Sequence, residues 1–195
     1  MRRLLTMAEA LVLTAAVAAS LTWGTHSVQA QAGSTVTWEA ESGTCESPVI
    51  KKTGSRADKK PGKPSKNSGS GWIEIPDKAN GEKKEGDHPG KAIYKVNVPA
   101  AGQYTFWART LWPNGCGNSF WIRLAERPNQ LLGEDGTYDV WKWRKVPNKL
   151  TLTKGVNTII VANREDGVIM DECQITTTSV EPQGPIAASA GALAN

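Results

Sequence analysis

The sequence predicts an all-β protein that closes as a β-sandwich or jelly roll. Short runs of alternating apolar and polar residues recur from Val36 to Thr177, and Gly, Pro and Asn separate these runs. No segment shows a sustained helical period. About eight or nine strands of this kind are enough to close a sandwich. The length of 195 residues corresponds to about one domain.

The individual strands follow from this alternation. They are expected at 36–41, 72–75, 91–98, 103–110, 119–124, 141–146, 149–152, 158–163 and 169–177. Alternate residues of a strand share a face, which predicts core faces made of Ala92, Tyr94, Val96 and Val98, of Tyr104, Phe106 and Ala108, and of Phe120, Ile122 and Leu124. Lys, Gly, Ser and Pro dominate 51–71, so we expect a long solvated loop there.

The N-terminal segment has the pattern of a secretory signal peptide. Arg2 and Arg3 precede an apolar run at 10–23, and small residues follow it around 28–32. The alternative is a membrane anchor, but an anchor needs about 20 apolar residues and Glu9 interrupts the run. We therefore expect a signal peptide at 1–32, a sandwich at 33–178 and a flexible tail at 179–195. The expected location is secreted or periplasmic, with no membrane span after cleavage.

Three cysteines lie in the part of the chain that follows the predicted cleavage. An extracytoplasmic location permits disulfides. Cys45 and Cys116 stand in Gly-containing loop sequence, so we predict a bond between them, whereas Cys173 falls in an alternating run and is expected to be buried and free. A zinc site is disfavoured because the sequence has no CxxC pair and His88 is the single histidine left.

The near-absence of histidine argues against a catalytic triad, because His88 lies in a Lys/Glu/Gly-rich loop. A glycosidase needs only two carboxylates, and Glu126, Glu165 and Asp166 lie in or near loops, but no spacing singles out a pair. We therefore predict that the protein is not an enzyme, with a lyase or glycosidase that uses loop acids as the alternative. Basic residues are seldom interleaved with aromatic ones, so nucleic acid is not an expected partner.

Three acidic residues suggest a metal site. Glu39 and Glu41 lie on one side of the first predicted strand, and Asp171 falls on a face of the last strand that is otherwise apolar. If these strands are neighbours, the acids could meet at a Ca²⁺ ion, with backbone carbonyls completing its shell. Alternatively, an arginine or backbone donors could pair with Asp171. The spacing fits both interpretations equally well.

Tryptophan is over-represented, with eight residues in the chain. Trp112 stands in a loop rich in Pro, Gly and Asn, and Trp141 and Trp143 share one face of a strand. An exposed indole ring can stack on the C–H face of a pyranose while polar neighbours bind its hydroxyl groups. Candidates for those polar partners are Arg109, Asn118, Arg164 and Glu165. For any one tryptophan, a place in the sandwich core fits the sequence equally well.

Several motifs together carry a family resemblance. They are, in order, Glu39-Ala40-Glu41, the run GKAIYKVNVPAAGQYTFWART at 90–110, Asn118-Ser119-Phe120, Trp141-Lys142-Trp143, Arg164-Glu165-Asp166-Gly167 and Met170-Asp171. This order resembles the non-catalytic carbohydrate-binding modules of families six and thirty-five, over most of residues 36–177. The resemblance implies a galactose-binding-like β-sandwich, and it implies that Glu39, Glu41 and Asp171 hold a structural calcium.

The family places its sugar site in the loops at one end of the sandwich, with aromatic platforms and an asparagine near the end of the module. No asparagine lies next to Asp171 here, so the family six site does not carry over intact. The remaining pattern, with Asn118, the Trp141/Trp143 pair and Arg164-Glu165, is closer to family thirty-five.

The sequence therefore predicts a secreted, monomeric, calcium-stabilised module that binds a polysaccharide without cleaving it, with Trp112 and Trp141 as stacking platforms. Arg109 and Arg164 hint at an acidic sugar, because a guanidinium can bind a carboxylate through two parallel hydrogen bonds. Alternatively, these arginines pair with Glu126 or Asp166 in structural ion pairs. A cell-surface adhesion domain that binds protein is a further alternative.

Overall fold

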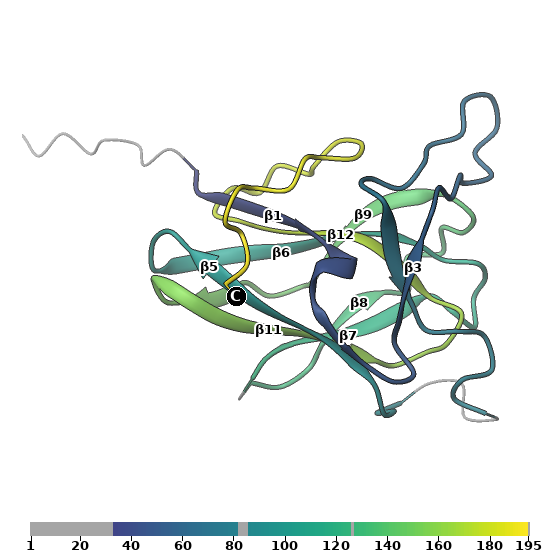
Figure 1. The fold of residues 1–195 in the computed structure, drawn as a ribbon, viewed down its shortest axis with the longest axis horizontal. Helices are drawn as coiled ribbons and strands as arrows, with labels where there is room; N and C mark the ends of the chain where they lie inside the picture. Colours follow the sequence, from purple (N-terminus) through teal and green to yellow (C-terminus); the bar gives the residue numbers. More distant parts are fainter. Residues whose placement is uncertain (1–32, 82–85, 126, 195) are drawn as a thin grey trace, which may run out of the picture. The chain divides into compact units, whose positions relative to one another are not determined.

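The computed structural model of the chain describes residues 33–81, 86–125 and 127–194. It confirms an all-β fold built from two antiparallel sheets (Figure 1). The five-stranded sheet runs in the order β2 (Thr44–Glu46), β5 (Lys91–Val98), β11 (Gly155–Asn163), β7 (Ser119–Leu124), β8 (Gln130–Gly133). The seven-stranded sheet runs in the order β10 (Leu150–Leu152), β6 (Gly102–Leu111), β12 (Ile169–Thr176), β4 (Gly71–Glu74), β3 (Ile50–Thr53), while β1 (Thr35–Glu39) also pairs with β12 and β9 (Trp141–Lys145) with β6.

The main core lies between the two sheets. The predicted inward faces are confirmed for β5 and β6 and for Phe120 and Ile122 of β7, all of which are buried in one cluster, whereas Leu124 is only partly buried against it. Trp38 of β1 completes this core, with its ring centroid 5.7 Å from that of Tyr94 and 6.2 Å from that of Phe106. Aromatic pairs at such spacings add to the stability gained from burial.

All nine predicted strands are present, within a few residues of their expected ends. Three further strands, β2, β3 and β8, were not predicted. Each has only three or four residues and at most one fully buried side chain, so it shows too little apolar alternation to identify it. These strands form because they pair with longer or better-defined neighbours: β2 with β5, β3 with β4, and β8 with β7.

The first predicted strand is shorter than expected. It ends at Glu39, and a 3-10 helix, η1 (Ala40–Ser42), follows it. Glu39 and Glu41 are therefore not alternate residues of one strand, and the argument that placed them on one strand face is wrong. The first and last strands are neighbours, as the calcium prediction required, because β1 pairs with β12 from Thr35↔Thr176 to Glu39↔Glu172.

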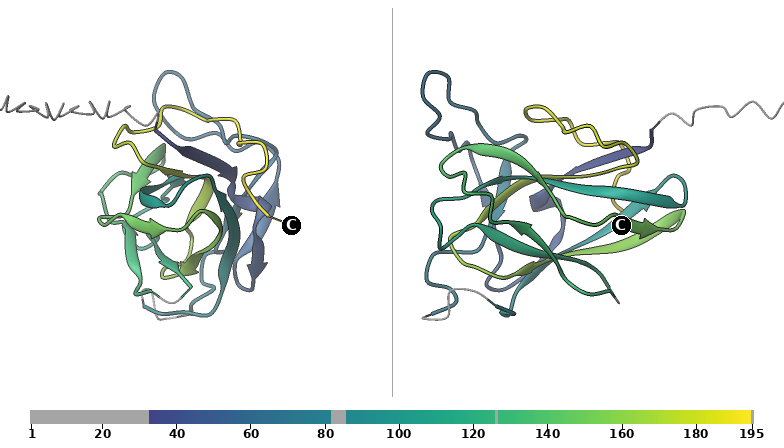
Figure 2. Two further views of the ribbon diagram at one scale, coloured as in Figure 1. Left: turned by 90° about the vertical axis from the view of Figure 1, so that its left-hand side faces the viewer. Right: turned by 180° about the vertical axis from the view of Figure 1, so that it is seen from behind.

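The segment expected to be a long solvated loop is instead an ordered hairpin between β3 and β4. It stands out from the sandwich (Figures 1 and 2), and paired backbone groups hold its arms together. The amide N–H of Gly54 donates to Ser70 O at 2.8 Å, and that of Asp58 donates to Ser65 O at 2.8 Å. We call residues 54–70 the basic hairpin.

The segment expected to be a flexible tail follows the surface of the sandwich and is hydrogen-bonded to it. The N–H of Ser189 donates to Thr37 O of β1, and the N–H of Ala194 donates to Lys95 O of β5, each at 2.8 Å. Ala192 belongs to the main core. The predicted signal peptide lies outside the described residues. Among the described residues, no helix has the length and apolar character needed to cross a membrane.

Candidate functional site

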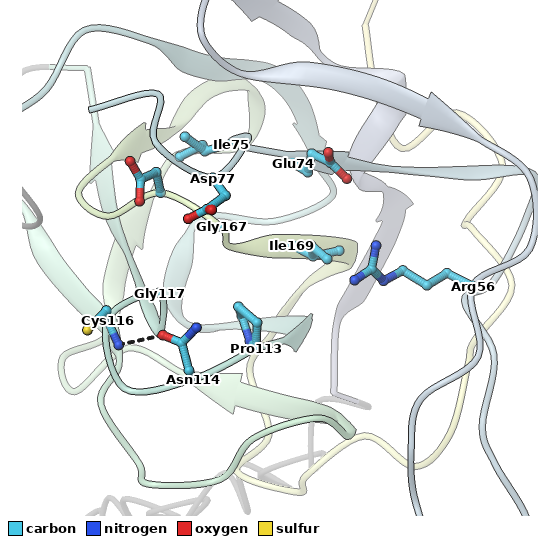
Figure 3. A pocket seen from close by; sticks show the side chains of 11 residues that line it. Arg56, Glu74, Ile75, Asp77, Pro113, Asn114, Cys116, Gly117, Gly167 and Ile169 are labelled. Atoms are coloured by element: carbon cyan, nitrogen blue, oxygen red, sulfur yellow. Dashed lines mark hydrogen bonds between the residues drawn. The ribbon is translucent and has the colours of Figure 1, made fainter. Parts of the chain in front are cut away.

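A cavity of about 380 Å³ opens among the loops where β4 and β6 end and β12 begins (Figure 3). We call it the loop-end cavity. Its walls come from the base of the basic hairpin (Arg56), the end of β4 and the residues after it (Glu74, Ile75, Asp77), the β6–β7 loop (Pro113, Asn114, Cys116, Gly117), and the β11–β12 loop with the start of β12 (Asp166, Gly167, Ile169). In the view of Figure 3, Arg56 and Glu74 lie on one side and Asp77 and Asn114 on the other.

Two carboxylates of this cavity are held in place by hydrogen bonds. Oε2 of Glu74 accepts a bond from Nε1 of Trp72 at 3.0 Å, and its Oε1 lies 3.7 Å from Nζ of Lys52. Oδ2 of Asp166 accepts a bond from the N–H of Asn80 at 2.9 Å. Asp77 is exposed on the rim. The cavity thus presents oriented hydrogen-bond acceptors to any ligand that enters it.

Pro113 gives the cavity a partly exposed apolar side chain, and the buried side chains of Ile75 and Ile169 lie behind it in the wall. The two loops beside them pack closely. A Cβ atom on Gly117 would lie 2.5 Å from the carbonyl oxygen of Asp166, so a side chain at this position would force the loops apart. Apolar surface combined with a few oriented polar groups is typical of small-molecule sites.

Trp112 does not serve as an exposed platform, and this prediction is wrong. Its side chain is fully buried, with its ring centroid 5.7 Å from that of Phe120 and the guanidinium carbon of Arg144 4.7 Å from its ring centre. The Pro and Gly content of its loop suggested exposure, but the partners that cover the ring come from β7 and β9. Only the residues after it, from Pro113 onward, line the cavity.

Trp141 and Trp143 of β9 are also buried, so neither offers a free ring face. The basic hairpin covers Trp141, whose Nε1 donates to Arg56 O at 3.0 Å. The tail covers Trp143, whose Nε1 donates to Gly184 O at 2.7 Å. Both predictions of an exposed platform are corrected for the same reason: segments that look unstructured in the sequence lie over the outer face of the sheet.

Asn118, Arg164 and Glu165 come together, as expected, but as an internal polar cluster. Oε2 of Glu165 accepts bonds from the N–H of Asn118 at 2.9 Å and from Oγ of Ser119 at 2.6 Å. Nη2 of Arg164 lies 2.7 Å from a carboxylate oxygen of Glu134. None of the three predicted residues is among those that line the cavity. Their polar groups serve mainly to join β7 to the β11–β12 loop.

Arg109 is the buried partner of Asp171. Its Nη1 donates to Oδ2 of Asp171, while its Nη2 donates to Ser65 Oγ at 2.7 Å and to Lys66 O at 2.8 Å. Both side chains are almost inaccessible, at 2% and 0% exposure. The interpretation that pairs Asp171 with an arginine is thus confirmed, and Arg109 is not placed to bind a ligand. Glu126, named as a possible arginine partner, lies outside the described residues.

The acidic residues predicted to bind calcium surround the base of the basic hairpin. Ser68 joins two of them, since its Oγ donates to Oε2 of Glu39 at 2.7 Å and its N–H donates to Oδ2 of Asp171 at 2.9 Å. The carboxylate of Glu39 lies against Gly69 of the hairpin, where a Cβ would be 2.9 Å from its carboxyl carbon, and that of Glu41 lies against Gly71 at the start of β4, where a Cβ would be 3.2 Å from its Oε1. The fold therefore leaves room for these carboxylates only because glycine stands there.

Burial and like charge raise the pKa values in this acidic cluster. Burial raises the pKa of Glu41 above 4.5, and the charges of Glu39 and Asp171 raise it further. Burial raises the pKa of Asp171 to about 6, against the opposing effects of Ser68 and Arg109, and it raises the pKa of Glu172 to about 8. Burial is the largest cause of each shift, because loss of water disfavours the charged form of a carboxyl group.

The residues present are compatible with a calcium ion at this place. Oε2 of Glu41 is buried and accepts no hydrogen bond from the described residues, which is the state of an oxygen that a cation would satisfy. Within the same described ranges, no three acidic, histidine or cysteine side chains form a metal site by themselves. Calcium takes about six to eight oxygen ligands, so backbone carbonyls would have to supply much of its shell.

The predicted disulfide is not present, since no bond joins any two cysteines of the described residues. Cys45 lies on β2 and packs against the core, whereas Cys116 belongs to the β6–β7 loop beside the cavity. Their similar loop-like sequences place them in different parts of the fold. Cys173 of β12 is fully buried and forms no disulfide, as predicted.

Sequence reasoning missed most of the cavity residues. Arg56 and Glu74 have no motif around them, and only the topology brings them next to Asn114 and Asp166. The Pro113-Asn114-Gly115 turn was a usable signal, because exposed loop residues often bind ligands. Among the described tryptophans, only Trp121 is not classed as buried, and its Nε1 donates to Gly86 O at 3.1 Å.

The sequence matches no protein-family model and no curated protein. Solved structures share the fold. A family 35 carbohydrate binding module from Clostridium thermocellum aligns with a TM-score of 0.51 and 18% identity, over 73% of this chain and 97% of that one. The CBM35 of Paenibacillus barcinonensis aligns with a TM-score of 0.50 and 21% identity, over 73% of this chain and 98% of that one. The GH26-CBM35 β-(1,4)-mannanase of Podospora anserina gives 0.53 and 17%, over 76% of this chain but only 28% of the mannanase.

Proposed function

We propose that the protein is a non-catalytic carbohydrate-binding module and that the loop-end cavity holds a sugar unit of a polysaccharide. The observation that carries this proposal is the lining of the cavity, where carboxylates fixed by hydrogen bonds stand beside apolar surface. Carboxylates accept hydrogen bonds from sugar hydroxyl groups, and the C–H face of a pyranose packs on partly exposed apolar side chains such as Pro113. The family 35 modules that share the fold are named for carbohydrate binding, which supports the same function.

The test compares retention on a panel of insoluble polysaccharides for the wild type and for Asp77→Ala. Asp77 is exposed in the cavity wall, so its loss should spare the fold while removing an acceptor. We expect the affinity for the retained glycan to fall about tenfold, the effect of one charged hydrogen bond. Glu181→Ala removes an exposed acid from the tail and serves as the control. The proposal would be contradicted if Asp77→Ala bound the glycan as tightly as Glu181→Ala. It would also be contradicted if the wild type were retained on immobilised protein and on no polysaccharide.

The enzyme alternative has one observation in its favour. Glu74, Asp77 and Asp166 line the same cavity, and glycoside hydrolysis needs a pair of carboxylates. Glu165, the acid singled out from the sequence, lies outside this lining, and the N–H of Asn118 and the hydroxyl of Ser119 occupy its Oε2. Release of oligosaccharide by the wild type that disappears in Asp77→Asn would favour hydrolysis over binding alone.

The proposal includes a calcium ion held by Glu39, Glu41 and Asp171, with backbone carbonyls of the basic hairpin. The unsatisfied buried oxygen of Glu41 supports it, and so does the meeting of the Glu39 and Asp171 carboxylates at Ser68. A bound cation would stabilise the junction between β1, β12 and the hairpin. Its chemistry there is structural, because none of the three acids lines the loop-end cavity.

Thermal unfolding with calcium and with excess chelator tests this site. An ion that binds only the folded state at about 100 times its dissociation constant adds about 2.7 kcal/mol, which for a domain of this size raises the melting temperature by about 5–10 °C. Glu41→Gln should abolish most of that difference. A melting temperature that does not respond to chelator would remove calcium from the proposal and leave the cavity unaffected.

The remaining parts of the proposal concern the setting and the sugar. On the strength of the N-terminal sequence pattern, we place the protein outside the cytoplasm, secreted or periplasmic. The proposal also takes it to act as a monomer. Arg109 and Arg164 do not argue for an acidic sugar, because Asp171, Glu134 and Glu165 already bind their guanidinium groups. Any preference for an acidic glycan must come from other basic residues.

A further inference from the structure

The charge of the protein is concentrated in one short segment. Residues 51–66 contain seven basic side chains and one acidic one, a net charge of +6, whereas the whole chain carries +4. The rest of the chain is therefore net acidic. A local excess of one sign attracts ligands of the opposite sign and raises their local concentration.

The segment that carries this charge is ordered by polar contacts. The carboxylate of Asp58 accepts bonds from the N–H groups of Ser65 at 2.9 Å and Trp141 at 3.1 Å. The side chain of Asn67 binds across the base, since its Oδ1 accepts from the N–H of Arg56 at 2.6 Å and its Nδ2 donates to Ser68 O at 2.9 Å. The charged side chains thus stand on a fixed scaffold, which lowers the entropy lost when a ligand binds.

Buried groups of the large sheet fix the direction of the hairpin. Arg109 of β6 donates to Ser65 and Lys66, and the ring nitrogen of Trp141 of β9 donates to Arg56. Figures 1 and 2 show the hairpin standing out from the sandwich beyond β3. Its tip is therefore presented to solvent in a constant orientation.

The lysines at the tip are available to a ligand. Lys59 forms an ion pair with Asp139 at 2.9 Å and Lys52 forms one with Glu74 at 3.7 Å, so two of the basic side chains of residues 51–66 already have acidic partners. Lys60, Lys63 and Lys66 are exposed, and no acidic side chain of the described residues pairs with them. The one acid of the segment, Asp58, is buried and faces the base.

The base of the basic hairpin borders the loop-end cavity. Arg56 belongs to this base and also lines the cavity, so a chain that leaves the cavity past Arg56 meets the hairpin that carries the lysines. Resting on the function proposed above, we propose that Lys60 and Lys63, with Lys66, bind the anionic groups of an acidic polysaccharide whose sugar unit occupies the cavity. The cavity itself is lined by three acids, so the hairpin supplies the preference for a charged polymer.

A nucleic acid is a polyanion too, but the hairpin lacks the parts that bind one. Proteins bind single strands by combining basic grooves with aromatic rings on which the bases stack. Residues 54–70 contain no aromatic residue. A polymer bound through its charges and hydroxyl groups suits this surface better than one bound through stacked bases.

The experiment measures binding of polygalacturonate and of its fully methyl-esterified form, which has the same sugars without the charge. The variant Lys60→Ser/Lys63→Ser is compared with Lys149→Ser/Lys154→Ser, which removes the same charge from exposed residues in the turns on either side of β10. In about 0.01 M salt we expect the hairpin variant to bind polygalacturonate about tenfold more weakly than the wild type. This difference should shrink to about threefold at about 0.15 M salt, because the Debye length falls from about 30 Å to about 8 Å.

The comparison of the two double variants separates a specific role of the hairpin from a general effect of charge. Equal weakening by both double variants would overturn the proposal in favour of a general charge effect, and unchanged binding by the hairpin variant would overturn it outright. Binding of a single-stranded oligonucleotide as tight as that of polygalacturonate would replace the polysaccharide as ligand. If neutral glycans bind and the charged form binds no better, this inference fails alone. If no glycan of either kind binds, the function proposed above fails with it.

Discussion

At the base of the basic hairpin, Asp58, Ser65 and Asn67 direct their polar atoms to partners inside the protein, whereas at its tip Lys60 and Lys63 extend into solvent. Both parts have the polar, Gly- and Pro-containing composition of a disordered loop. The base is nevertheless fixed, because a buried arginine and a buried tryptophan reach it from the sheet. Order in such a segment depends on whether buried donors and acceptors find partners in it.

This difference separates two functions along one hairpin. At the base, each hydrogen bond also satisfies a group that would otherwise be buried without a partner, so changes there should affect stability. At the tip, side chains are hydrated in the folded and unfolded states alike, so changes there should affect binding only.

The largest effect is expected from Arg109→Met. This change leaves the carboxylate of Asp171 buried without its ion pair and removes the donor to Ser65 and Lys66. Breaking a buried pair on one side costs about 3–5 kcal/mol, so the free energy of unfolding measured by urea titration should fall by that amount. The tip variant Lys60→Met is the control and should stay within about 0.5 kcal/mol of the wild type. Similar values for both would mean that the base is not the stabilising part.

A smaller loss is expected from Asp58→Ala. Without this carboxylate, the N–H groups of Ser65 and Trp141 lose their acceptor, which costs about 1–3 kcal/mol when the donor is buried. The arms of the hairpin should also open locally, so limited proteolysis should cut between Arg56 and Lys66 faster than in the wild type. Lys63→Ala at the tip should change neither measurement. Faster cleavage without any loss of global stability would show that the hairpin opens independently of the sandwich.

The sequence was sufficient to predict the sandwich because each core strand shows its own alternation of apolar and polar residues. Tyr104, Phe106 and Ala108 alternate with residues of the other face, and this alternation alone reports burial between two sheets. It also placed Asp171 on the face of Cys173 and Ile175, and this is wrong: the register of β12 shifts between Met170 and Glu172, so that Met170 joins Cys173 and Ile175 in the main core. Its partner Arg109 lies on the face of β6 opposite Tyr104, Phe106 and Ala108, so alternation alone could not have paired it with Asp171.

The candidate site was not predictable in the same way. Exposure of Trp112 was inferred from the neighbouring Pro113 and Gly115. Its burial depends instead on Phe120 and Arg144, which are distant in sequence and which the fold brings against the ring. The basic hairpin likewise gives no local sign of order, since all its anchors are distant in sequence. Contacts between remote polar residues leave no periodic pattern, which is why the site was predicted less well than the core.

The smallest effect is expected at Asp135, and it tests whether burial of the acid decides how much an arginine–carboxylate pair stabilises the protein. Asp135 binds the buried guanidinium of Arg144 at 3.1 Å, but unlike Asp171 it remains partly exposed. Burial alone would raise the pKa of Asp135, but the hydrogen bonds from Lys142 and Arg144 outweigh it and lower the pKa below 3.8. Because the folded protein holds this proton less tightly than the unfolded chain, the stabilisation is complete above about pH 4 and is lost as the pH falls through the lowered value.

We therefore expect Asp135→Asn to lower the free energy of unfolding by about 1 kcal/mol near neutral pH, after allowance for solvent screening. The difference from the wild type should shrink toward zero when urea titrations are repeated at about pH 2, where the wild-type carboxyl is also protonated. A difference that persists in acid would mean that the hydrogen-bond geometry of Asp135, and not its charge, is what stabilises the loop. A loss as large as that of Arg109→Met would mean that exposure of the acid does not weaken the pair, which would remove the physical distinction between the two sites.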